Sequence, residues 1–146
     1  MATINVQIKG IKETLKKFEK FGEEGVKEVQ EVTRFVADDI VADAKRLSPV
    51  DTGRLRQSIS RQEVNKLTQR IVSSEKYAPY MEFGTGRLTS IPTELKELAS
   101  LFKGKGVKEI NIPAQPFMYP AFILGRQEYL EELKDSLKYL TGKFGK

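Results

Sequence analysis

The stretch EEGVKEVQEVTRFVADDIVADAKRL, residues 23–47, sets the fold, because it predicts one long amphipathic helix. Its apolar residues recur at spacings near 3.6, the period that keeps side chains on one helix face. They are Val26, Val29, Phe35, Val36, Ile40, Ala44 and Leu47. Pro49 ends the pattern, since proline disfavours helical geometry in the residue before it.

The segments around this helix predict strands and shorter helices. Residues 3–10 alternate apolar and polar side chains, as a half-buried strand does, and residues 58–64 and 67–73 predict a hairpin that turns at Asn65-Lys66. Helical patterns occupy residues 11–21, 52–56, 92–102 and 120–140, and KEINIP, residues 108–113, predicts a short strand. The apolar stripe of the last helix is Leu130, Leu133, Leu137 and Leu140. This order predicts an α+β fold, with an antiparallel sheet packed against a long N-terminal helix and a C-terminal helix.

The composition restricts the function. The chain has 146 residues with no cysteine and no histidine, so thiolate chemistry, the commonest general base and the commonest metal ligand are all missing. We therefore expect no enzyme, no cofactor and no metal site. The length predicts one domain over residues 1–141, with a flexible tail at 142–146. No apolar run approaches the roughly 20 residues of a membrane span, and the N-terminus has no secretory pattern.

The net charge of +5 arises in residues 51–146, which carry sixteen Lys/Arg and eleven Asp/Glu. The basic residues of the hairpin region 54–70, with two tyrosines nearby, are compatible with a small nucleic-acid-binding module, since aromatics among cations can stack bases. They are Arg54, Arg56, Arg61, Lys66 and Arg70. Asp51 and Glu63 dilute this cluster, so an ordinary exposed sheet face is the favoured interpretation.

A second unusual stretch, YAPYMEFGTG, residues 77–86, combines aromatics, a proline and two glycines. It is either a buried turn that ties the hairpin to the core or a surface presented to a neighbouring subunit. We expect positive φ at Gly53 and Gly84, because both lie in turn-like contexts. We also expect four aromatic residues to join the core; they are Tyr77, Tyr80, Phe83 and Phe117.

Three segments in order carry a family resemblance: SPVDTGRLRQSI (48–59), YAPYMEFGTG (77–86) and QPFMYPAF (115–122). We call them the first, second and third motif segments. Together they resemble the gene-product-ten-like family of lambda-like tailed bacteriophages, which are tail-completion or head–tail joining proteins. The matching positions are Pro49, Thr52, Gly53, Leu55, Ser58 and Ile59 in the first, Tyr77, Ala78, Tyr80, Glu82, Gly84 and Thr85 in the second, and Pro116, Phe117, Pro120 and Ala121 in the third.

The resemblance implies a virion structural protein of the neck or tail, encoded by a phage or prophage and present in the bacterial cytoplasm before assembly. It implies a homo-oligomeric ring between the head connector and the tail-tube or tail-terminator proteins, without catalysis, cofactor, membrane or specific nucleic acid. The loop FKGKGVKE places Lys103, Lys105 and Lys108 among glycines. We expect this loop to be an interface that orders against acidic groups of a neighbour.

Overall fold

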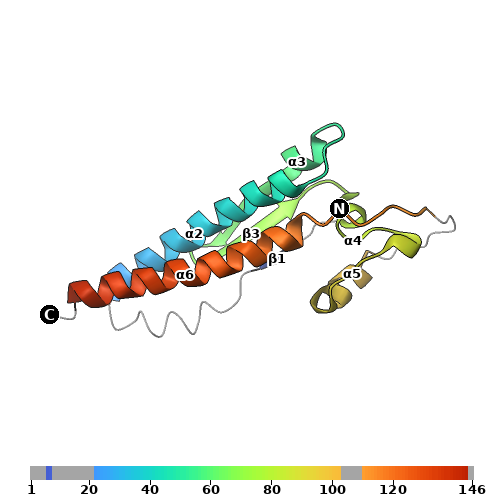
Figure 1. Ribbon diagram of the computed structural model, residues 1–146. Helices are drawn as coiled ribbons and strands as arrows, with labels where there is room; N and C mark the ends of the chain where they lie inside the picture. The colour runs from blue at the N-terminus through green and yellow to red at the C-terminus, as the bar shows by residue number, and fades with distance from the viewer. Residues whose placement is uncertain (1–5, 8–21, 103–109, 145–146) are drawn as a thin grey trace.

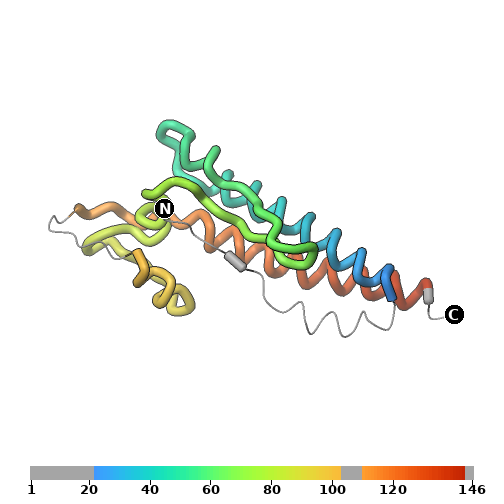
Figure 2. The backbone as a smooth tube through the Cα atoms, turned by 180° about the vertical axis from the view of Figure 1, so that it is seen from behind, coloured from blue at the N-terminus to red at the C-terminus, as the bar shows by residue number. Residues whose placement is uncertain are grey.

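The computed structural model describes residues 6–7, 22–102 and 110–144. Two long helices, α2 (Gly22–Leu47) and α6 (Met118–Phe144), run antiparallel beside a small sheet (Figure 1). The hairpin of the sheet lies along one side of these helices (Figure 2), and a smaller lobe lies beyond the start of α6. The predicted α+β fold, an antiparallel sheet against two long helices, is confirmed.

Helix α2 is the centre of the core and packs against both α6 and the sheet. Its buried residues follow the predicted period: Gly25, Val29, Val32, Thr33, Val36, Ala37, Ile40 and Ala44. Phe35 was expected on this face, but it is 54% exposed. Five residues at 3.6 per turn place Phe35 about 140° from Ile40 around the axis of α2, so Phe35 points away from the buried face.

The sheet has three antiparallel strands in the order β1-β3-β2, from β1 (Val6–Gln7), β2 (Ile59–Asn65) and β3 (Thr68–Ser73). Ile59 lies opposite Ser73, and Val6 lies opposite Ile71. The hairpin turns one residue later than expected, at Lys66-Leu67. The side-chain Oδ1 of Asn65 accepts the N–H of Leu67 at 2.9 Å, and this local bond fixes the turn.

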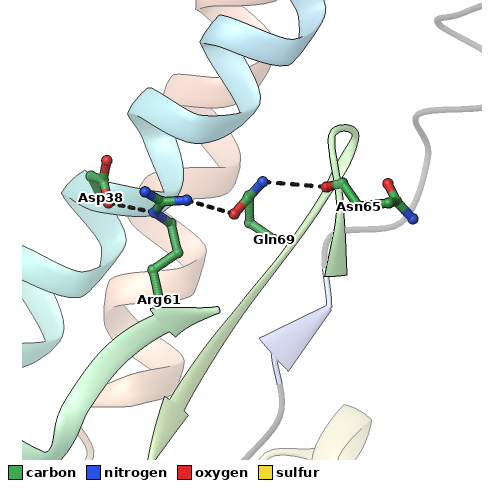
Figure 3. A network of polar contacts seen from close by, with 4 residues as sticks. All are labelled: Asp38, Arg61, Asn65 and Gln69. Carbon is green, nitrogen blue, oxygen red and sulfur yellow. Dashed lines mark hydrogen bonds and ion pairs between the residues drawn. The ribbon is translucent and has the colours of Figure 1, made fainter. Parts of the chain in front are cut away.

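A polar network joins the sheet to α2 (Figure 3). The Arg61 guanidinium donates to Oδ1 of Asp38 on α2 at 2.6 Å and to Oε1 of Gln69 on β3 at 2.8 Å. Gln69 is only 1% exposed, and its Nε2 donates to the Asn65 carbonyl at 3.4 Å. Because a buried amide costs free energy unless it is hydrogen-bonded, this network allows Gln69 to face the helix.

Helix α6 is longer than expected at both ends. Pro120 lies in its first turn, where the missing N–H breaks no intrahelical bond. At the other end the helix runs to Phe144, and Lys143 pairs with Glu24 at the start of α2. Leu133 and Leu140 are buried as predicted, whereas Leu130 is 50% exposed. Its neighbour Tyr129 is buried instead.

The hydroxyl of Tyr129 links the two long helices. It lies 3.1 Å from Oγ1 of Thr33, and the Thr33 hydroxyl donates to the carbonyl of Val29 at 2.6 Å. Burial raises the pKa of the Tyr129 hydroxyl, while its bond to Thr33 opposes the shift. The neutral phenol is therefore the form that the helix interface favours.

Gly125 lets α2 and α6 approach closely, and replacing it tests that packing. A Cβ there would lie 2.1 Å from Cγ1 of Ile40, whereas a Cβ at Gly142 on the same helix meets nothing within 4 Å. We expect Gly125→Ala to be less stable than Gly142→Ala by about 1–3 kcal/mol, because only the first overpacks the interface. Urea melts of the two variants measure this difference, and equal midpoints would contradict it.

The remaining expected elements differ in detail. The helix expected over 92–102 is a 3-10 turn, η3 (Thr93–Leu95), followed by α5 (Lys96–Ser100). The described part of KEINIP, residues 110–113, forms no strand. The helix expected over 11–21, the loop lysines 103, 105 and 108, and the last two residues lie outside the described part of the chain. No helix among the described residues is long and apolar enough to cross a membrane.

Candidate assembly surface

The three motif segments, which are far apart in sequence, meet around one pocket of about 360 Å³. The first segment supplies the turn before α3 (Arg54–Ser58), the second supplies α4 (Ala78–Phe83), and the third supplies Gln115, shortly before α6. The residues that line the pocket are Pro49, Val50, Asp51, Thr52, Gly53, Arg54, Leu55, Tyr77, Met81 and Gln115. The three motif segments, separate in the sequence, therefore come together in space around this pocket, which we call the motif pocket.

Glu82 fastens the second motif segment to the third. Its carboxylate is 2% exposed, and Oε2 accepts the N–H groups of Phe117 and Met118, each at 2.9 Å. Oε1 accepts the N–H of Tyr119 at 2.8 Å. These N–H groups begin α6 and have no intrahelical acceptor, and the positive end of the helix dipole favours a carboxylate. Glu82 thus caps α6 from a distant segment.

Gly84 and Thr85 form a clasp with residues 110–114. The N–H of Thr85 donates to the Ile112 carbonyl at 2.9 Å, and its Oγ1 accepts the Ile112 N–H at 2.9 Å while donating to the Ile110 carbonyl. Gly84 has φ +72°, and a Cβ there would lie 2.4 Å from the Leu88 carbonyl oxygen and 2.8 Å from the Ala114 nitrogen. Only glycine permits this approach.

The aromatic residues of the motif segments divide between core and surface. Phe117 is fully buried and Phe83 is 5% exposed, as predicted. Tyr77 and Tyr80 are each 39% exposed, so their expected place in the core is wrong. Helix α4 buries Ala78, Pro79, Glu82 and Phe83, and the two tyrosines, three residues apart, lie on its other face.

Residues 12–84, half of the chain, match the family model described as "Bacteriophage HK97-gp10, putative tail-component". The chain belongs to the HK97-gp10-like family. Neither the curated proteins nor the solved structures provide a match. The family is a structural component of the phage tail without catalytic activity, and so is this chain. The matched residues contain the first motif segment and end at Gly84 in the second, so the clasp partner at 110–114 and the third segment lie beyond them.

Several residues predicted as site residues of this HK97-gp10-like chain have structural roles. Leu55 is 3% exposed and belongs to the core. The Ser58 hydroxyl donates to the Leu55 carbonyl at 2.7 Å and lies 2.8 Å from the Ser73 hydroxyl of β3. Thr52 and Pro116 are exposed, whereas Pro49 and Pro120 are partly buried. The motif segments therefore combine residues that hold the fold with residues left at the surface.

Three of the five basic residues of the hairpin region are engaged in contacts within the chain. Arg54 pairs with Glu75 at 3.5 Å, the Nε of Arg56 donates to the Lys45 carbonyl at 2.9 Å, and Arg61 turns inward to Asp38. Nucleic-acid binding through this hairpin thus gains no support from the geometry. Within the described ranges, no group of three or more carboxylates is arranged to hold a metal ion.

Two glycines of the HK97-gp10-like motif segments test the clasp. Both have the expected positive φ, +76° at Gly53 and +72° at Gly84, but a Cβ at Gly53 meets only Gln57 Nε2, at 3.8 Å. We expect Gly53→Ala to cost about 1 kcal/mol of unfolding free energy through backbone strain. Gly84→Ala should cost at least about 1 kcal/mol more, because it also overpacks backbone atoms. Denaturant melts compare them, and an unchanged midpoint for Gly84→Ala would remove the clasp from this account.

Proposed function

We propose that this tail component acts in the neck of the virion, as one subunit of a ring that completes the tail and joins it to the head. Its partners are then the head connector on one side and the tail-tube or tail-terminator proteins on the other. The order of the three motif segments supports this assignment, since it resembles tail-completion proteins over most of the chain.

The observation that carries the proposal is the exposed apolar rim of the motif pocket. Val50 is 59% exposed and lines the pocket with Tyr77, and Tyr80 lies one helical turn from Tyr77. Tyrosine combines a large apolar area with a polar tip, and it is enriched at protein interfaces. Exposed apolar side chains of this kind, at the rim of a pocket, mark a protein–protein interface.

The loop lysines extend the proposal. Lys103, Lys105 and Lys108 lie between α5 and the clasp residues 110–112 in the sequence. We infer that they meet acidic groups of a neighbouring neck protein. Changing all three to glutamate should leave the unfolding midpoint unchanged and abolish tail attachment, because opposite charges would become like charges. Normal tailed particles from this variant, seen by electron microscopy, would remove the lysines from the interface.

The rim itself is tested by a double substitution, Val50→Ser with Tyr77→Ser, in the phage or prophage that encodes the chain. The matched control is Val64→Ser, since Val64 is a similarly exposed valine, 49% exposed, on β2. We expect native-like melts for both variants. Only the rim variant should yield filled heads and separate tails in electron micrographs. A rim variant that gives as many joined particles as the control would refute the assignment.

A further inference from the structure

The outer face of the two long helices carries two similar rows of side chains. On α2, Phe35, Asp39 and Asp43 recur every four residues, and on α6, Leu124, Glu128 and Glu132 do the same. A spacing of four keeps each row on one side of its helix. The helices lie side by side (Figure 1), and the Glu128 side chain is within hydrogen-bonding reach of Asp39. We call these two rows the acidic helix face.

The acidic helix face leaves two apolar side chains about half exposed. Phe35 is 54% exposed and Leu124 is 47% exposed, and each begins its row. The carboxylates beside them repel one another: burial and the charges of Asp39, Glu132 and Asp43 raise the pKa of the Glu128 carboxyl. Arg46 contacts Asp43 at 2.9 Å and neutralises one end of the face. Cations brought by a partner would relieve the remaining repulsion.

The charge of the chain is divided between these helices and the rest. Helices α2 and α6 together contain eleven Asp/Glu and eight Lys/Arg, whereas the other residues contain nine and seventeen. Two acidic helix faces would repel each other across a two-fold dimer. An acidic face and a basic surface on a second copy would attract, and such complementarity sets the register of an interface.

The motif pocket has the reciprocal character. Beside its apolar rim, Val50 and Tyr77, the pocket is lined by one cation, Arg54, and one carboxylate, Asp51. The Arg54 side chain is 72% exposed although it contacts Glu75, and Lys76 and Arg56 are also exposed. One surface is therefore apolar with acidic neighbours, and the other is an apolar hollow whose neighbouring charged residues are mostly basic.

We propose that the motif pocket of one copy receives the acidic helix face of the next copy. Phe35 and Leu124 then lie against the apolar rim, and Arg54 and Lys76 pair with Asp39 and Glu128. This contact rests on the ring function proposed above and supplies its subunit interface. Because the two surfaces differ, the contact is heterologous, and repetition produces a ring where the rotation closes.

Crosslinking tests the contact directly, because the chain has no cysteine of its own. Particles are made with a full-length chain carrying both Val50→Cys and Leu124→Cys and are treated with a short flexible bismaleimide. We expect a ladder of covalent oligomers that ends at the ring size. Each single-cysteine chain should stay monomeric. A control pair, Val64→Cys with Leu124→Cys, should also give no ladder.

Two results separate the failure of this inference from the failure of the ring function. Particles that contain the doubly substituted chain in a ring, yet give no ladder, overturn the contact and leave the ring function standing. Joined particles from which the chain is absent overturn the ring function and the contact with it. A ladder from the control pair that equals that of the test pair also overturns the contact.

Charge exchange tests the named pairs. Asp39→Lys with Glu128→Lys should lower the yield of infectious particles at least 100-fold, and adding Arg54→Glu with Lys76→Glu to the same chain should restore it to within about 10-fold. Thermal melts must show that each variant folds, and Glu97→Lys, at an exposed site on α5, is the control. A normal yield from the lysine variant, or no recovery in the fourfold variant, would overturn the assigned contact.

Discussion

Replacing Glu82 with alanine is expected to lower the free energy of unfolding by about 3–5 kcal/mol. The carboxylate is 2% exposed and accepts three backbone N–H groups at 2.8–2.9 Å, so its removal leaves three donors at the start of α6 without that acceptor. Each buried donor that loses its partner costs roughly 1–3 kcal/mol, and the favourable charge at the helix end is lost as well.

Chemical denaturation followed by circular dichroism measures the effect. Glu97→Ala, at an exposed glutamate of α5, is the matched control and should change the unfolding free energy by no more than about 0.5 kcal/mol. Glu82→Gln should fall between the two, because it keeps one acceptor oxygen but no charge. If Glu82→Ala unfolds at the same denaturant concentration as the control, Glu82 does not hold the motif segments together.

Replacing Phe117 with alanine should also cost about 3–5 kcal/mol, the usual loss when a buried phenylalanine becomes alanine. Phe117 is fully buried in the core cluster with residues of α2 and the sheet. Tyr80→Ala, at an aromatic residue 39% exposed, is the matched control and should melt close to the natural chain. A Phe117→Ala variant that keeps near-native stability but fails to complete tails would make Phe117 a contact residue instead.

The fold could be predicted because its main elements have strong local periods. Residues 23–47 repeat at 3.6, the hairpin strands alternate, and both patterns appear in the structure with ends shifted by a residue or two. The errors in the predicted core came from counting apolar residues without considering the direction in which each one points around the helix axis. Phe35 and Leu130 lie next to buried positions in sequence, but on a helix that neighbour points about 100° away.

The sequence predicted which segments belong to the candidate site, but not how their residues are arranged in space. The motif segments and the positive φ of Gly53 and Gly84 follow from residue type and turn context. The function of Glu82 does not, because it acts 35–37 residues away, on backbone groups that every residue has. The hydrogen bonds between Thr85 and Ile112 could not be predicted for the same reason. The sequence also does not show that Tyr77 and Tyr80 lie at the surface.

The neck function is tested most directly by making particles without the chain. A stop codon early in its gene, in the phage or prophage that encodes it, is expected to yield DNA-filled heads and separate tails of normal length in electron micrographs. Purified chain added to that lysate should then join them into infectious particles. Joined, infectious particles that form without the chain would contradict the account.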